Sequence, residues 1–273
     1  VGARRLIAVS EPGAFAVVGS ALVGELGAAS WEIETVMLPE SEAAKRLAVI
    51  ETAASQLARL RVERGEPIVA IGGGALGDAA GFLAATYLRG IPVIHVPTTL
   101  VAQIDSSIGG KTAVDLPEGK NLVGAFHQPT AIVIDASVTR SLPERQRRAA
   151  LGEAVKMAAL GDERLFELLE RGGAAIARGD PAVYERGAVA ELVERSAWAK
   201  VEVVVADEKE RTSSGTGRIS LNLGHSLGHA VEAAAGYGGL LHGEAVAYGL
   251  RAATRIGAAM EVTPPDRAER IGA

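Results

Sequence analysis

The stretch IVAIGGGALGDAAGFLAATYLRG, residues 68–90, predicts the fold of the first half of the chain. Residues 68–71 form a short apolar run bounded by turn residues, which is typical of a buried strand. Gly72, Gly73 and Gly74 follow directly, and a helical pattern begins after them. Such a turn indicates a nucleotide site, because glycines let the backbone approach a pyrophosphate and helix N-terminal amides favour its charge. A tight strand-to-helix turn without a ligand is the alternative.

Short β-branched runs alternate with amphipathic stretches on both sides of this segment. Four further strands are expected at residues 5–9, 33–38, 93–96 and 131–135, and residues 41–65 favour a crossover helix that ends at Gly65. After Asp135 the strand signals fade and helices take over. The pattern predicts an α/β N-terminal nucleotide-binding domain with a Rossmann-like parallel sheet, residues 1–138, and an all-α C-terminal metal-binding domain, residues 139–273.

The composition excludes several classes of partner. The 273 residues include 28 basic and 33 acidic side chains, and the net charge of −5 argues against a nucleic-acid surface or a polybasic membrane patch. There is no cysteine, so a bound metal must have nitrogen and oxygen ligands. No apolar run reaches the length of a spanning helix, and no secretory signal opens the chain. We therefore expect a cytoplasmic protein that binds small molecules, without nucleic-acid or membrane partners.

A polar, glycine-rich segment follows the strand at 93–96. In VPTTLVAQIDSSIGGKTAVDLPEGKNLVG, residues 96–124, Thr98 and Thr99 stand where open α/β sheets collect ligands. Lys111, Lys120 and Asn121 supply cationic and amide donors, which suit a phosphorylated or carboxylated ligand. A plain hairpin turn with solvated lysines at DLPEGKN is the alternative.

Three of the five histidines lie in LNLGHSLGHAVEAAAGYGGLLHGEAV, residues 221–246. His225 and His229 are four residues apart on one predicted helix, and His242 begins the next. Two neutral imidazoles and one carboxylate are a common catalytic zinc set with one coordination position left open. The carboxylate could belong to Glu232, Glu244 or the earlier Glu153, and spacing does not choose among them.

An acid and a lysine also share a helix face in LGEAVKMAAL, residues 151–160. Glu153 and Lys156 are three residues apart, amid alanine, valine and methionine. An ordinary surface ion pair would give the same spacing.

Taken together, these motifs resemble the 3-dehydroquinate synthase family. The matching stretches are GGGALGD, YLRGIPVIHVPTTLVAQIDSSIGGKTAVDLPEGKNLVGAFHQP, GEAVK, DEKE, LNLGHSLGHAVE and HGEAVAYG, from about Glu42 to the end of the chain. The resemblance implies an NAD-binding domain and a helical domain, with the active site in the cleft between them. It also implies that 3-deoxy-D-arabino-heptulosonate 7-phosphate, a phosphorylated keto acid, becomes 3-dehydroquinate and phosphate in the shikimate route to aromatic amino acids.

The resemblance implies roles for particular residues. Glu153, His225 and His242 become the ligands of a divalent metal, expected to be Zn²⁺, with Co²⁺ as the other option, and His229 becomes a substrate contact. NAD contacts fall on Glu42, Lys45, Gly74, Gly77, Asp78, Thr98, Thr99 and Lys120. Substrate and catalytic positions fall on Asp105, Lys111, Asn121, Lys156, Lys200, Glu210, Arg218, Asn222 and His229, and Arg89 is expected to reach the neighbouring subunit of a homodimer.

The family chemistry explains why these residue types are used. NAD transiently oxidises a ring hydroxyl, phosphate leaves, the ketone is reduced again and the ring closes as an aldol, so that NAD is unchanged at the end. The substrate carries a carboxylate and a phosphate, which the lysines and Arg218 oppose locally although the whole chain is acidic.

The sequence departs from the family pattern in three places. The turn after the first strand reads VSEPGA, residues 9–14, where members have a TDxNV-like turn, so adenosine binding is expected to differ. The polar loop TSSGTG, residues 212–217, lengthens the segment before Arg218. Members continue beyond VTPPDRAERIGA, residues 262–273, so we expect the C-terminal end to be incomplete.

Three other functions fit parts of the pattern. Another sugar-phosphate cyclase would use the same cofactors on a different substrate. A metal-dependent, NAD-linked polyol dehydrogenase would share the two-domain plan and the glycine turn but would accumulate NADH. A binding or assembly domain without catalysis would retain the ligands but release no product.

Overall fold

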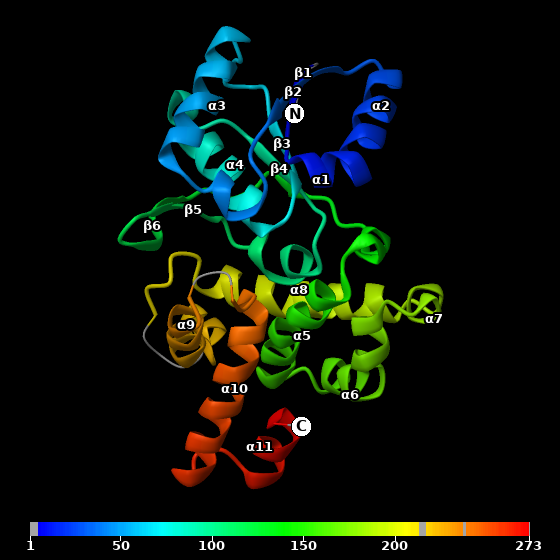
Figure 1. Ribbon diagram of the computed structural model, residues 1–273, viewed down its shortest axis with the longest axis vertical. Coiled ribbons are helices and arrows are strands. Elements are labelled where there is room, and N and C mark those ends of the chain that lie inside the picture. Colours follow the sequence, from blue (N-terminus) through cyan, green and yellow to red (C-terminus); the bar gives the residue numbers. More distant parts are fainter. Residues whose placement is uncertain (1–4, 213–216, 237–238, 273) are drawn as a thin grey trace. The chain divides into compact units, whose positions relative to one another are not determined.

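A computed structural model describes residues 5–212, 217–236 and 239–272, which form two compact units (Figure 1). Unit 1 is Val1–Ser141 and unit 2 is Leu142–Ala273. The boundary expected from the sequence, between residues 138 and 139, falls inside the short helix η5 (Ala136–Ser141).

Unit 1 is built on a parallel sheet, as the sequence predicts. Its strands are β1 (Arg5–Ser10), β2 (Glu32–Met37), β3 (Ile68–Gly72), β4 (Val93–Pro97) and β7 (Ala131–Ile132), in the order β2-β1-β3-β4-β7. Neighbouring strands are parallel throughout. The order places the strand that ends in the glycine turn between β1 and β4. The carboxyl ends of three adjacent strands therefore surround that turn.

Helices cover both faces of this sheet. The larger core lies on the side of α3 (Leu47–Arg59) and α4 (Gly74–Thr86), and the smaller core lies against α2 (Ser20–Ala28) (Figure 1). Two short elements, α1 (Pro12–Ala14) and η1 (Phe15–Gly19), lead into α2. Both layers can pack on the sheet because successive side chains of a strand point to opposite faces, and β3 is buried at every position.

The crossover helix ends earlier than the sequence predicts. Arg61, and not Gly65, takes the left-handed conformation, with φ of 52°. The Val62 amide then donates to the Leu57 carbonyl over 3.0 Å, and both side chains are buried. Burial of Val62 thus outweighs the local preference for glycine at this turn. The predicted helix start is also split, because residues 41–44 form the separate element η2 (Ser41–Ala44).

The DLPEGKN segment, residues 115–121, forms the turn of a hairpin. Strands β5 (Lys111–Leu116) and β6 (Gly119–Phe126) pair antiparallel and form a separate two-stranded sheet. The remaining elements of unit 1 are η3 (Tyr87–Arg89) and η4 (Ala102–Ser106).

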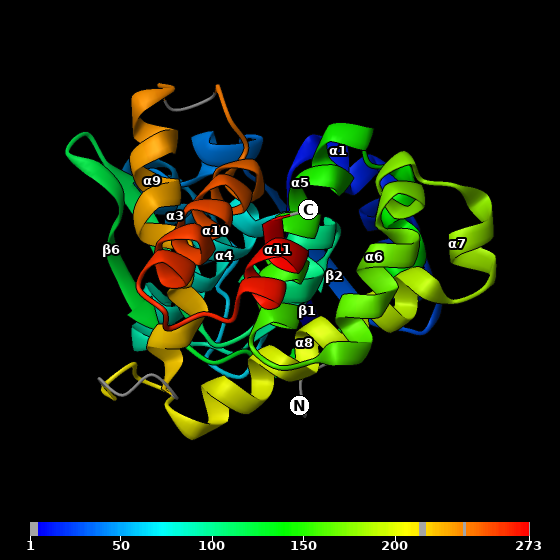
Figure 2. The ribbon, with the colours of Figure 1, turned by 90° about the horizontal axis from the view of Figure 1, so that it is seen from below.

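Unit 2 contains only helices among its described residues. They are α5 (Glu144–Ala159), α6 (Glu163–Arg178), α7 (Pro181–Glu185), α8 (Ala188–Ala206), η6 (Arg218–Asn222), α9 (His225–Ala234), α10 (His242–Ala259) and α11 (Pro265–Gly272). Helix α10 contacts α5, α9 and α11 (Figure 2). Most of the predicted polar loop, residues 213–216, lies outside the described residues. None of the described helices has the length and apolarity that a bilayer crossing would require.

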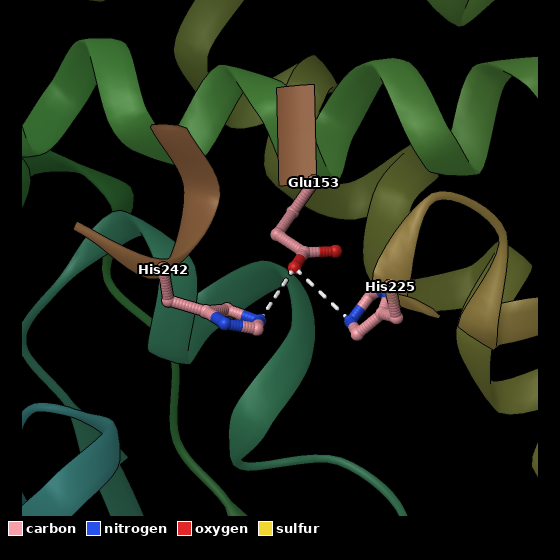
Figure 3. Close-up of side chains that lie close together, drawn as sticks. All are labelled: Glu153, His225 and His242. Atoms are coloured by element: carbon pink, nitrogen blue, oxygen red, sulfur yellow. Dashed lines mark ion pairs between the residues drawn. The ribbon is translucent and has the colours of Figure 1, made fainter. Parts of the chain in front are cut away.

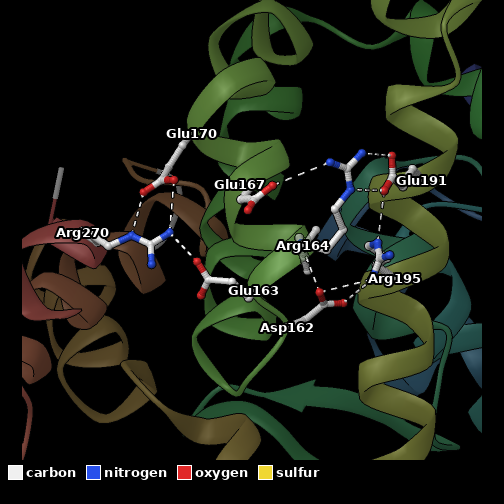
Figure 4. A network of polar contacts seen from close by, with 9 residues as sticks. Asp162, Glu163, Arg164, Glu167, Glu170, Glu191, Arg195 and Arg270 are labelled. Carbon is white, nitrogen blue, oxygen red and sulfur yellow. Dashed lines mark hydrogen bonds and ion pairs between the residues drawn. The ribbon is translucent and has the colours of Figure 1, made fainter. Parts of the chain in front are cut away.

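An exposed ion-pair network joins α6, α8 and α11 (Figure 4). Arg164 lies 2.7 Å from Glu191, and Arg195 lies 3.1 Å from Asp162. Arg270 of α11 lies 2.8 Å from Glu163. The Asp162 carboxylate also caps α6, because it accepts from the Leu165 amide over 2.9 Å. These contacts link the exposed faces of α6, α8 and α11.

Candidate nucleotide and metal sites

The glycine turn of unit 1 lies at the carboxyl end of β3. Gly73 has extended dihedral angles and no side chain caps α4, so the first amides of this helix remain available to an anion. A Cβ on Gly74 would lie 2.6 Å from the Ser106 hydroxyl, and a Cβ on Gly72 would lie 2.4 Å from a Leu76 methyl carbon. The close packing therefore requires glycine at both positions, while Gly77 follows one turn into the helix.

The two predicted threonines stand directly beside this turn. The Thr98 amide donates to the Gly72 carbonyl over 2.9 Å, and a Cβ on Gly73 would lie 3.1 Å from a Thr99 methyl carbon. The Thr99 hydroxyl accepts from the Ala102 amide over 3.2 Å, which fixes the start of η4. The structure thus brings Thr98 and Thr99 to the same sheet edge as the glycines.

A buried lysine gathers three elements near the same edge. Lys45 is 4% exposed, and its Nζ lies 2.8 Å from Asp78 Oδ2 of α4 and 3.9 Å from Asp115 of β5. It also donates to the Asn121 side chain of β6. Lys120, next to Asn121, lies 3.7 Å from Glu42. These contacts place η2, α4 and the hairpin against one another.

Asp115 was not identified from the sequence, although it lies among the residues that surround Lys45 and contacts Asn121. Its carboxylate accepts from the Asn121 amide over 2.8 Å, and Asn121 takes a left-handed φ of 59°. The available signal was an acid at the start of the hairpin turn DLPEGKN, where aspartate commonly accepts from a following backbone amide.

The other predicted residues of unit 1 lie at separate points. Asp105 lies in η4, and Lys111 is exposed at the first position of β5. Arg89 is exposed at the end of η3, with φ of 66°, and no described contact joins it to the other predicted residues.

Unit 2 brings Glu153, His225 and His242 together (Figure 3). The His242 Nε2 lies 3.1 Å from Glu153 Oε1, and the His225 Nε2 lies 3.7 Å from the same oxygen. One ligand atom from each residue lies within 4.8 Å of the other two. Carboxylate and imidazole donors at this spacing fit a tetrahedral zinc site with an open position. We call this set the three-residue cluster.

Glycines explain how three helices approach closely enough to form the cluster. A Cβ on Gly243 would lie 1.9 Å from the Ala149 carbonyl oxygen, so α10 crosses α5 backbone to backbone. A Cβ on Gly249 would lie 1.9 Å from the Gly224 carbonyl oxygen, so α9 is equally close to α10. Gly224 precedes His225 and has φ of 79°, which favours glycine.

The geometry selects one of the three carboxylates that the sequence spacing left as candidate metal ligands. The Glu244 carboxylate accepts two hydrogen bonds from the Arg145 guanidinium, over 2.7 and 2.8 Å, so it does not face the histidines. Glu232 lies 3.7 Å from Nδ1 of His242, on the opposite side of the ring from Glu153. Only Glu153, among these three, faces both imidazoles in the described structure.

The electrostatic environment favours neutral imidazole at His225. Burial lowers the pKa of His225, an effect that outweighs the opposing attraction of Glu153. Its Nδ1 lies 3.3 Å from the Leu223 carbonyl oxygen, which orients Nε2 toward Glu153. The side chain is therefore held in the form that binds metal.

The Glu153 and Lys156 pair is buried, so the surface interpretation was wrong. Lys156 Nζ lies 2.5 Å from Glu153 Oε2, and the two side chains are 1% and 0% exposed. His229 lies close by, with its ring centroid 5.5 Å from that of His225 and 5.8 Å from that of His242. It is outside the set that could share a metal ion.

The last predicted residues lie in α8, in η6 and in the segment between them. Lys200 of α8 is buried, and Arg218 is 1% exposed and donates to the Glu208 carbonyl over 2.6 Å. The Asn222 side chain donates to Glu210 over 2.9 Å. Glu210 and Asn222 are therefore brought together, whereas Lys200 lies on another element.

Solved structures place the fold in one class. The chain is similar to 2-epi-5-epi-valiolone synthase from Streptomyces hygroscopicus subsp. jinggangensis 5008, with NAD+ and Zn2+ bound: the TM-score is 0.87, the identity 28%, and the coverage 98% of this chain and 72% of that one. It is also similar to 2-deoxy-scyllo-inosose synthase complexed with carbaglucose-6-phosphate, NAD+ and Co2+, with a TM-score of 0.83, 29% identity, and coverage of 98% and 70%. The fold is that of the sugar-phosphate cyclases.

Sequence comparisons identify the family within this class. The family model for the 3-dehydroquinate synthase N-terminal region matches residues 35–149, and that for the C-terminal region matches residues 150–273. The 3-dehydroquinate synthase of Symbiobacterium thermophilum is 46% identical over 253 residues, which are 93% of this chain and 68% of that protein. The chain belongs to the 3-dehydroquinate synthase family.

Proposed function

We propose that this chain converts 3-deoxy-D-arabino-heptulosonate 7-phosphate to 3-dehydroquinate and phosphate. The observation that carries the proposal is the three-residue cluster of Glu153, His225 and His242, found in a chain that matches the family models from residue 35 to residue 273. The relatives named 3-dehydroquinate synthase support this substrate over those of the two structural neighbours, because the identity is 46% against 28 and 29%.

The cofactors we propose are NAD and one divalent metal, Zn²⁺ or Co²⁺. NAD, when bound, supplies reversible hydride transfer, and the metal, when bound, supplies Lewis-acid stabilisation of negative charge on the substrate. Glu153, His225 and His242 would hold the metal. The residues that would hold NAD are Glu42, Lys45, Gly74, Gly77, Asp78, Thr98, Thr99 and Lys120.

The environment of the metal cluster suits an anionic substrate. The buried Glu153 and Lys156 charges offset each other, and burial favours neutral imidazole at His225. A bound dication would therefore leave net positive charge to attract a carboxylate or phosphate. Lys156, which lies beside Glu153 on the buried side of the site, would donate to the substrate.

Other polar residues would bind and orient the two charged ends of the substrate. We assign this role to Asp105, Lys111, Asn121, Lys200, Glu210, Arg218, Asn222 and His229. Arg218 is well suited because its guanidinium is buried and already anchored to the Glu208 carbonyl, so little side-chain entropy is lost on binding. Glu210 and Asn222 would hold each other in place.

We further propose that the chain acts as a homodimer in the cytoplasm. The exposed Arg89 supports the first part, because the family resemblance directs this residue to a neighbouring subunit. Light scattering on the purified chain tests the stoichiometry, and a monomeric mass at catalytic concentration would contradict it.

The activity test is a phosphate-release assay. The chain would be incubated with NAD, Zn²⁺ and the heptulosonate phosphate, and we expect equal amounts of inorganic phosphate and dehydroquinate without net NADH. Lys111→Ala should lower turnover while the metal content stays unchanged. A chain that binds NAD and metal yet releases no phosphate would refute the assignment. Faster turnover of another heptulose or hexose phosphate would favour a different cyclase, and NADH accumulation with a neutral polyol would favour a dehydrogenase.

A further inference from the structure

Glu232 is a buried acid that stands behind one histidine of the three-residue cluster. It lies in α9 and is 7% exposed, and its Oε2 lies 3.7 Å from Nδ1 of His242. The other ring nitrogen of His242, Nε2, lies 3.1 Å from Glu153. The imidazole is therefore set between two carboxylates, one at each nitrogen. The family resemblance gives Glu232 no role.

Helix α9 brings this acid to the cluster by its spacing. His225 is the first residue of α9, and Glu232 follows seven residues later, two turns along the same helix face. A Cβ on Gly228, between them, would lie 2.9 Å from the Ala245 carbonyl oxygen, so α9 and α10 cross here in close contact. One face of α9 thus carries a candidate metal ligand, His225, and the acid that faces the neighbouring candidate ligand, His242.

The two imidazoles are oriented in different ways. The His225 side chain is 15% exposed, and its Nδ1 lies 3.3 Å from the Leu223 carbonyl oxygen. The His242 side chain is 41% exposed, so packing restrains it less, and the group that faces its Nδ1 is the Glu232 carboxylate. A neutral histidine that binds a metal through Nε2 carries its proton on Nδ1, and an acceptor there fixes the tautomer and the ring orientation. For His242, Glu232 stands in the position of that acceptor.

We propose that Glu232 is a positioning residue, which orients His242 for the metal by accepting from its Nδ1. The proposal rests on the metal assignment made above. At 3.7 Å the contact is longer than a hydrogen bond, and contacts of this kind often tighten only in the complex. The negative charge of Glu232 also makes the imidazole a stronger donor to the metal, and water screens a buried charge only weakly.

The first measurement is the dissociation constant of zinc, obtained by competition with a chromophoric chelator. Glu232→Gln keeps the side-chain shape and an acceptor oxygen but removes the charge, so we expect zinc binding to weaken about tenfold. Glu232→Ala removes the acceptor as well, and its loss should approach about 100-fold. Asp207→Asn is the matched control, because it changes another buried acid of unit 2, which accepts from the backbone amides of Arg211, Thr212 and Arg218. It should change the zinc constant by less than about twofold.

A double-mutant cycle separates positioning from a merely structural role. Because Glu232 acts through His242 in this proposal, Glu232→Ala should change the zinc constant by less than about twofold in a His242→Ala chain, measured over a higher range of zinc. The visible absorption spectrum of bound Co²⁺ should shift in Glu232→Ala alone, since the ligand field depends on the orientation of His242. Equal losses of zinc affinity in the two backgrounds would overturn the proposal.

The remaining outcomes distinguish the positioning role from the metal site itself. Circular dichroism checks that each variant folds, and the cycle is run with Glu232→Gln where Glu232→Ala does not fold. Zinc binding that is unchanged in the Glu232 variants would refute the positioning role alone. Failure of the unaltered chain to bind zinc would instead refute the metal assignment, and the role of Glu232 with it.

Discussion

Two groups of charged side chains in unit 2 have similar contact distances but different surroundings. The cluster of Figure 3 has contacts of 3.1 and 3.7 Å between its two imidazoles and Glu153, which is fully buried. The network of Figure 4 has contacts of 2.7 to 3.8 Å, but the Arg164 side chain is 50% exposed. In the network, water screens every pair, whereas in the cluster one acid is held in a dry environment. Burial, rather than proximity, therefore separates a candidate metal site from surface ion pairs.

The partners differ as well. In the network a guanidinium lies opposite each carboxylate, and Arg164 lowers the pKa of Glu191 through a direct hydrogen bond. In the cluster, Glu153 pairs with Lys156 through one oxygen but faces two imidazoles with the other, and burial favours the neutral form of His225. A network of matched charges needs no ion, while the cluster has donor atoms that a cation can share.

The largest effect is expected when Glu153, the acid of the three-residue cluster, is substituted. Glu153→Gln removes the charged ligand without changing the side-chain volume, so we expect metal affinity to fall more than about 100-fold and phosphate release to stop, with the fold retained. Metal content after dialysis, activity and circular dichroism measure the three quantities. His242→Ala should give the same loss.

The control for this test comes from the exposed network. Glu167→Gln removes an acid 3.8 Å from Arg164 and should leave the metal content unchanged. Unaltered metal stoichiometry in both Glu153→Gln and His242→Ala would refute the ligand assignment.

A second test separates the cluster from the helix crossing that positions it. Gly243→Ala places a methyl group against the Ala149 carbonyl, so we expect a loss of about 3 kcal/mol in the free energy of unfolding and weaker metal binding. Gly172→Ala, in a helix where the nearest atom would be 4.0 Å away, should instead stabilise by up to about 1 kcal/mol. Urea denaturation measures both, and equal effects in the two variants would argue against backbone contact between α5 and α10.

A third test extends the role of burial to unit 1. Burial lowers the pKa of His95 to about 4, with a smaller contribution from His127. Because the unfolded side chain has its ordinary pKa near 6.5, acid protonates the unfolded state first. The contribution of neutral His95 to the free energy of unfolding is complete above pH 6.5 and is lost as the pH falls toward 4. The free energy of unfolding should therefore drop by about 2 kcal/mol between pH 8 and pH 5.

The matched variant for this test is His95→Gln, which does not titrate. Subtracting its pH profile from that of the unaltered chain isolates the His95 contribution from those of other groups. Parallel profiles would mean that the His95 environment admits the charged form.

The smallest effect is expected in the exposed network. Arg164→Ala removes contacts with Glu191 and Glu167, but solvent screens both. We expect the melting temperature to change by little more than the error of the measurement, and the difference to shrink further in high salt. A large decrease in the melting temperature that does not depend on salt would show that these exposed ion pairs stabilise the fold as strongly as buried ones do.

The sequence predicted the sheet well because strands and glycine turns leave local signals. The apolar runs predicted all five parallel strands, although the last one, expected at residues 131–135, covers only Ala131–Ile132, and Gly72 to Gly74 located the turn. The end of the crossover helix was wrong because burial of Val62, a tertiary effect, decided it. The role of the DLPEGKN segment stayed open, because the same residues suit a ligand-binding segment and a plain hairpin turn with solvated lysines.

The metal cluster was harder to predict from local sequence patterns. His225 and His242 stood out because the chain has few histidines, but their acid lies far away in the sequence and only the family resemblance or the fold selects Glu153. The burial of Lys156 depends on helix packing that spacing alone does not reveal.

Both histidines of the cluster are the first residues of their helices, α9 and α10. The amide ends of two helix dipoles therefore point toward the ion site, each with about half a positive charge. These dipoles oppose protonation of the imidazoles and attract anions, so they act in the same direction as a bound metal. A chain with a net charge of −5 can in this way offer a phosphorylated acid a locally positive surface before any side chain moves.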